Sequence, residues 1–82
     1  MRFDLQCEIE VEADAAHERY GHFASTHEGY GVLAEEVAEL LDAIRANKLE
    51  SVRSEAIQVA AVAMRLAECC RKNDAFAKRS GA

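Results

Sequence analysis

The sequence predicts an all-α protein, and its composition and apolar periodicity carry that prediction. Alanine fills 16 of the 82 positions, and proline is absent. Alanine has the highest helix propensity, and proline is the strongest helix breaker. Apolar residues recur at helical steps along most of the chain. We expect one domain over residues 1–82, with an ordered core from about 5 to 72, in which an N-terminal helix precedes an antiparallel helical hairpin.

The N-terminal segment, residues 3 to about 20, fits two patterns. Apolar residues at positions 3, 5, 7, 9 and 11 alternate with polar ones, which is typical of a strand. Apolar residues at positions 5, 9, 13, 16 and 20 follow helical spacing instead. A lone strand would have no partner in the rest of the chain, so a helix is predicted.

Three of the four glycines lie at positions 21–31 and bracket the segment 23–27, which is predicted as the only substantial loop. A second helix is predicted from residue 28 to about 47, with Ser25 or Thr26 as its N-cap. Its predicted core-facing stripe consists of Tyr30, Leu33, Val37, Leu40, Leu41 and Ile44.

A short connection, residues 47–50, separates the second helix from the third. Ser51 is a plausible N-cap for a helix that runs from about residue 52 to 71. So short a connection predicts an antiparallel hairpin. The tail, residues 73–82, is expected to add at most a short turn around Phe76 before it frays.

The third helix is apolar around nearly its whole circumference. Between Ala56 and Ala67 only Gln58 and Arg65 are polar. Such a helix has to be covered on nearly every side, and two neighbouring helices in a chain of this length are too few. The sequence therefore predicts a homodimer or higher oligomer that completes a four-helix or larger bundle.

Acidic residues on the two hairpin helices point to a metal site. Glu36 and Glu39 share a face of the second helix, and an antiparallel hairpin places the early part of the third helix opposite them, so that Glu55 and Gln58 are expected to converge with them on one spot. Three carboxylates crowd together only around a cation, and Mg²⁺, with Mn²⁺ as a substitute, prefers such ligands. The alternative is an ordinary solvated acidic face, with Gln58 bonded to a backbone group or across an interface.

Two motifs resemble those of a known family. Glu35-Glu36-Val37-Ala38-Glu39, followed by Glu55-Ala56-Ile57-Gln58, resembles the signature of the all-α nucleoside triphosphate pyrophosphatases of the MazG-like superfamily. The stretch 27–37 is similar to small single-domain members often found in phages, and the likeness covers roughly residues 17–70. The resemblance implies Mg²⁺-dependent hydrolysis of a nucleoside triphosphate to the monophosphate and pyrophosphate, in a dimeric or tetrameric bundle.

The resemblance also implies the ligands of the metal, which fall on Glu36, Glu39, Glu55 and Gln58. The family usually has an aspartate where this chain has Gln58, and an amide oxygen ligates Mg²⁺ without contributing charge. Gln58 is therefore expected to weaken metal affinity or to orient a neighbouring carboxylate. The alternative function is a helical dimerisation or interaction module that has kept the bundle and lost the chemistry.

Further residues are assigned roles on the enzyme hypothesis. Glu35 is expected to hold a second metal ion or to orient the attacking water. Arg65, Lys48 and Arg53 are candidates for binding distal phosphates, although salt bridging or solvation would also account for each of them. His27, at the start of the second helix, is a candidate for contact with the base.

Composition argues against several other classes. A formal net charge of −5 argues against a general nucleic-acid binder. The longest nearly apolar run, residues 56–64, is far too short to span a membrane, and the N-terminus lacks the apolar core of a signal peptide, so a cytoplasmic location is expected. Three cysteines and three histidines lack the spacing of a zinc site, which makes a transition-metal protein the least favoured class.

Overall fold

The computed structural model describes residues 2–71, 78 and 81. Within residues 2–71 the chain forms three α-helices, α1 (Arg2–Tyr20), α2 (Thr26–Arg45) and α3 (Leu49–Cys69), and the described residues contain no strand. The all-α prediction is confirmed, and so is the choice of a helix over a strand for the N-terminal segment. The tail predicted to turn around Phe76 lies almost entirely outside the described residues.

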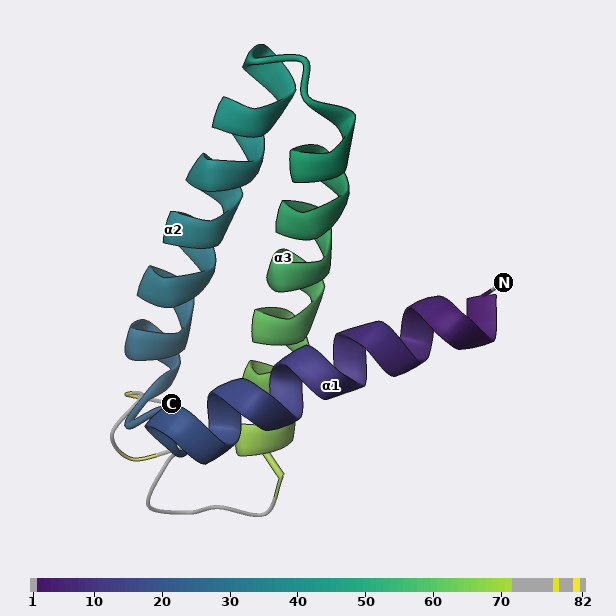
Figure 1. Cartoon of the computed structure of the whole chain (residues 1–82). Coiled ribbons are helices and arrows are strands. Elements are labelled where there is room, and N and C mark those ends of the chain that lie inside the picture. Colours follow the sequence, from purple (N-terminus) through teal and green to yellow (C-terminus); the bar gives the residue numbers. More distant parts are fainter. Residues whose placement is uncertain (1, 72–77, 79–80, 82) are drawn as a thin grey trace.

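The three helices form a hairpin with one helix laid across it (Figure 1). α2 and α3 run antiparallel, as predicted, and α1 packs against α3 where it crosses the hairpin. The N-terminal half of α1 extends beyond the hairpin (Figure 1). The crossing of α1 over the hairpin therefore brings parts of all three helices close together.

The connection between α1 and α2 is shorter than predicted. Gly21 adopts a φ of 75° and donates its N–H to the carbonyl of His17, which ends α1. Ser25 Oγ accepts the N–H of Glu28 at 3.1 Å, which confirms Ser25 as the N-cap of α2. The Glu28 carboxylate accepts the N–H of Ala24 at 2.6 Å and completes a reciprocal cap. α2 therefore begins two residues before the predicted start.

The predicted start of α3 is wrong by three residues. Ser51 was expected to cap the helix, but it lies inside the first turn, because α3 already begins at Leu49. Asn47 adopts a left-handed φ of 57°, which reverses the chain within a very short connection. The N–H of Val52 then bonds to the carbonyl of Lys48 at 2.9 Å and closes the first turn.

The core is small and lies near the α1–α2 connection. Phe23, Val62 and Cys69 are buried together, and Val32, Leu33 and Leu66 pack against them. Gly29 lets α2 approach α3 here, since a Cβ at this position would stand 2.5 Å from Leu66 Cδ1. Among the described residues, no large side chain is fully buried.

The predicted core-facing stripe of α2 is only partly correct. Leu33 and Leu40 are half-buried. α3 covers one side of α2, so the other side of the stripe faces solvent in the single chain. Four of the six residues are exposed: Tyr30, Val37, Leu41 and Ile44.

No helix within the described residues is long and apolar enough to cross a membrane.

Candidate functional site

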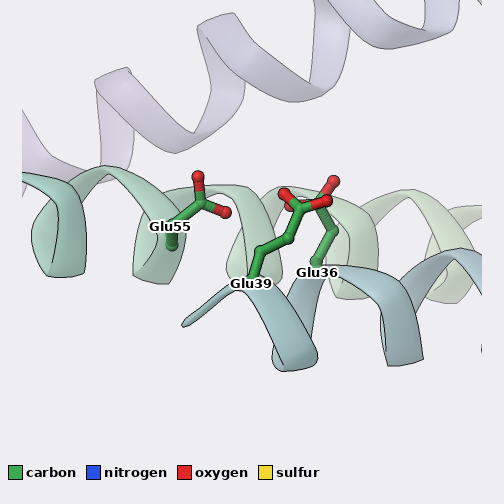
Figure 2. Close-up of side chains that lie close together, drawn as sticks. All are labelled: Glu36, Glu39 and Glu55. Carbon is green, nitrogen blue, oxygen red and sulfur yellow. The ribbon is translucent and has the colours of Figure 1, made fainter. Parts of the chain in front are cut away.

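Three glutamates converge between the two helices of the hairpin. Glu36 and Glu39 lie one turn apart on α2, and Glu55 lies in the part of α3 that runs past them (Figure 2). One carboxylate oxygen from each residue lies within 4.8 Å of the corresponding oxygens of the other two. We call these three residues the glutamate cluster. It contains three of the four residues predicted to converge in the antiparallel hairpin, the fourth being Gln58.

The glutamate cluster is partly shielded from water, and two of its oxygens receive no hydrogen bond from the described residues. Glu36 and Glu55 are half-buried, and Glu39 is exposed. Oε2 of Glu36 and Oε2 of Glu55 are both buried without a hydrogen-bond partner among the described residues. No basic side chain of the described residues forms an ion pair with the cluster, since the ion pair they contain joins Arg53 to Glu8. Buried acceptors without donors are costly, so this arrangement calls for an added proton or cation.

The pKa values of two cluster members reflect this environment. Burial raises the pKa of Glu36 above its ordinary value of 4.5, and the charges of Glu39, Glu55 and Glu35 raise it further. Burial is also the largest cause that raises the pKa of Glu55, followed by its interaction with Glu39. The folded chain therefore disfavours full ionisation of the cluster in the absence of a cation.

The donor set of the glutamate cluster fits a hard divalent cation. Carboxylate oxygens are the preferred ligands of Mg²⁺, Mn²⁺ and Ca²⁺, and the three converging carboxylates form a group that could hold such an ion. Mg²⁺ keeps open coordination positions for water or substrate phosphate when a protein supplies few ligands. Glu36, Glu39 and Glu55 are thus the residues that would hold the metal.

Gln58, the fourth predicted ligand, has another partner. Its Nε2 donates to Glu12 Oε2 at 3.0 Å, which joins α3 to α1. The amide oxygen of Gln58 takes no part in this bond and remains a potential ligand. Gln58 is half-buried and lies one turn beyond Glu55 on α3.

A cavity of about 760 Å³ adjoins the glutamate cluster. α1, the α1–α2 connection, α2 and α3 all contribute to its walls, and Glu36 belongs both to the cluster and to the cavity lining. Gln58, Val62 and Arg65 line it along α3. Its size is within the range of small-molecule sites in proteins.

Arg65 lies in the wall of this cavity and is almost fully buried. Its side chain is 7% exposed, and Nη2 donates to the carbonyl of Gly21 at 3.2 Å. The guanidinium carbon lies 4.4 Å from the centre of the Phe23 ring, at the distance of a cation–π contact. Arg65 is the one predicted substrate-binding residue that lines the cavity.

The other predicted site residues lie outside the cavity. Arg53 donates to both carboxylate oxygens of Glu8, at 2.9 and 2.6 Å. Lys48 is exposed at the hairpin turn, and His27 is exposed in the first turn of α2. Glu35 is exposed on α2 beside Glu36.

Sequence reasoning missed the cavity residues that come from other segments. Glu12 was not selected because α1 was a helix only by a narrow choice, which left its inward face uncertain. Phe23 lies in the α1–α2 connection, where no periodicity indicates which side chains are buried.

The histidines and cysteines do not complete a metal site in the described residues. His22 Nδ1 lies 3.6 Å from Cys69 Sγ, and the rings of His17 and His22 are 4.4 Å apart. Among residues 2–71, 78 and 81, the glutamate cluster is the group of at least three potential ligands whose atoms converge on one point.

Comparison of the chain with models of protein families, with curated proteins and with solved structures found no match.

Proposed function

We propose that this protein hydrolyses a nucleoside triphosphate to the monophosphate and pyrophosphate with the help of Mg²⁺. The observation that carries the proposal is the glutamate cluster, in which three carboxylates converge without a basic partner among the described residues. The resemblance of residues 35–39 and 55–58 to the MazG-like pyrophosphatases supports the same activity. A substrate-sized cavity that shares Glu36 with the cluster supports it further.

In this proposal Glu36, Glu39 and Glu55 would hold the metal, and the ion would supply positive charge that offsets the charge of the phosphate oxygens. Water attacks the α-phosphorus and gives up a proton to solvent, the bond between that phosphorus and the oxygen that bridges to the β-phosphate breaks, and pyrophosphate leaves. Glu35, adjacent to Glu36, orients the water or holds a second ion. Gln58 contributes its amide oxygen or fixes Glu12 through the bond at 3.0 Å.

We further propose that the active form is a homodimer. The exposed apolar residues Tyr30, Val37, Leu41 and Ile44 fall within an arc of about 60° on α2, at 100° per residue. A second copy that covers this face would complete the bundle, and the lack of any fully buried large side chain in the described part of one chain supports this. Light scattering is expected to give twice the mass of one chain.

The direct test incubates the protein with a panel of ribo- and deoxynucleoside triphosphates and Mg²⁺, and measures pyrophosphate. Glu39→Gln is expected to abolish activity, because it removes a ligand charge from an exposed position where the fold does not depend on it. Glu68→Gln makes the same chemical change on the exposed surface of α3 and is the matched control. Circular dichroism shows whether both variants keep their helices.

Two outcomes would contradict the proposal. Activity that survives Glu39→Gln, or that persists in excess EDTA, would assign the signal to another site or to a contaminant. Failure to release pyrophosphate from any triphosphate, with Mg²⁺ or Mn²⁺, would favour the alternative of a dimerisation module without chemistry.

A further inference from the structure

Arg65 has more hydrogen-bonding capacity than the described residues use. A guanidinium carries five N–H donors, and residues 2–71, 78 and 81 provide one acceptor, the carbonyl of Gly21 at 3.2 Å, together with the ring of Phe23. No carboxylate of the described residues forms an ion pair with Arg65, although the side chain is only 7% exposed. A buried cation without a counter-charge is costly, and the cavity beside it is where acceptors would enter.

The cavity side of α3 presents four kinds of chemistry in a fixed order. Positions 55, 58, 62 and 65 lie within an arc of about 80° at 100° per residue. They carry an acid of the glutamate cluster, an amide, an apolar side chain and a guanidinium. Arg65 lies about 15 Å beyond Glu55 along the helix axis, at 1.5 Å per residue.

A nucleotide carries its groups in the same order. With its phosphates at the glutamate cluster, its sugar would lie beside the hydrogen-bonded pair of Gln58 and Glu12, whose remaining oxygens accept bonds from hydroxyl groups. The base would then lie over Val62, which is buried in the cavity floor, and would turn an edge toward Arg65.

The contacts of Arg65 determine which edge it would bind. The guanidinium carbon lies over the Phe23 ring, and the carbonyl of Gly21 accepts a bond from one of its nitrogens, so the group is held in place before a ligand arrives. All the remaining polar atoms of the guanidinium are donors. The O6 and N7 atoms of a 6-oxopurine both accept bonds from such a fork, whereas an amino group at position 6 presents its own donors and repels it.

We propose that Arg65 makes the cavity selective for 6-oxopurines over their 6-amino counterparts. This inference rests on the proposed function, because the glutamate cluster sets which end of the cavity receives the phosphates. It replaces the expectation that Arg65 binds a distal phosphate.

The test compares inosine triphosphate with adenosine triphosphate, which differ in the oxo or amino group at position 6. The native chain is expected to have a kcat/KM at least about tenfold higher for inosine triphosphate, the size of a bidentate arginine contact to a base. In Arg65→Leu the ratio is expected to fall to about one. Arg65→Lys keeps the charge beside Phe23 but lacks the fork, and it is expected to lose most of the preference. Arg45→Leu, on the exposed end of α2, is the matched control and should keep the ratio.

A structural role for Arg65 would lower both rates alike and leave the ratio unchanged, and so would a role on phosphate. Either result overturns the inference. If no triphosphate is hydrolysed, titration calorimetry with the nucleosides inosine and adenosine in EDTA tests the cavity without phosphate or metal. Tighter binding of inosine that Arg65→Leu and Arg65→Lys remove would uphold base selectivity while the hydrolase proposal fails. Equal binding, or none, would overturn it.

Discussion

The same residue type, glutamate, occurs in two opposite settings at the two contacts that α3 makes with its neighbouring helices. At the α1–α3 contact, exposed Glu8 receives two hydrogen bonds from Arg53, which hold the pKa of Glu8 below its usual value. At the α2–α3 contact, burial raises the pKa values of Glu36 and Glu55, and no arginine or lysine of the described residues is paired with them. Glu8 thus meets a cation supplied by the chain, whereas the cluster has no cationic partner among the described residues.

The difference matters because only one of the two settings is favourable for folding by itself. The exposed pair of Glu8 and Arg53 is solvated and hydrogen-bonded, and it changes the free energy of unfolding little. The glutamate cluster places like charges together and leaves buried oxygens without donors. An arrangement that opposes folding is typical of a functional site, where affinity for a ligand is gained at the expense of stability.

The largest expected effect concerns binding of the metal. Glu55→Gln should weaken binding of Mg²⁺ or Mn²⁺ at least about 100-fold, because even the removal of groups that only support a ligand costs 10- to 100-fold. Calorimetry with Mg²⁺, or the loss of the free Mn²⁺ signal in electron paramagnetic resonance, measures this change.

Glu8→Gln removes the same charge from the surface and is the control for that experiment. It should leave the affinity nearly unchanged, because Glu8 already has a partner in Arg53. Equal losses in the two variants would mean that the ion binds diffusely to an acidic protein, and the distinction between the two settings would fail.

The second effect is the pH dependence of stability in EDTA. Because the pKa values of Glu36 and Glu55 are raised, the folded chain binds more protons than the unfolded chain above about pH 4.5. The contribution of these groups to stability therefore falls as the pH rises from about 4.5 through their raised pKa values. The Tm is expected to fall by several degrees more in the native chain than in the Glu36→Gln/Glu55→Gln double variant.

Saturating Mg²⁺ should remove this fall, since the ion binds the ionised carboxylates and competes with protons. Tm measured by circular dichroism between pH 4.5 and 8, with EDTA or Mg²⁺, gives both slopes. Parallel pH profiles for the native chain and the double variant in EDTA would show that the cluster carries no excess protons when folded.

The sequence predicted the parts of the molecule that depend on helical periodicity. The sequence could predict that Glu36, Glu39 and Glu55 lie together, because a short connection allows only an antiparallel hairpin and the spacing on each helix is fixed. It could not predict where α3 starts, because the left-handed conformation of Asn47 made Ser51 unnecessary as a cap.

The cavity was beyond sequence reasoning for a different reason. It depends on the angle at which α1 crosses α3, and helix crossing angles follow from three-dimensional packing that a single apolar pattern does not encode. That angle brings Glu12 to Gln58. A related limitation led to the wrong prediction that Tyr30 faces the core of the single chain. Periodicity identifies the apolar face of a helix, but it does not show whether one chain can cover that face.

The smallest effect is the most discriminating in sign. In EDTA at neutral pH, Glu36→Gln should raise the Tm, because it removes a charge that burial and like-charged neighbours oppose. Glu8→Gln should lower the Tm by roughly two degrees or less, because exposed ion pairs contribute little. The decrease in Tm caused by Glu8→Gln should become smaller in about 0.5 M NaCl, because salt screens the attraction between Glu8 and Arg53 at the surface. A decrease of similar size in both variants would mean that Glu36, like Glu8, has a favourable partner in the folded chain, and that the cluster does not require an external cation.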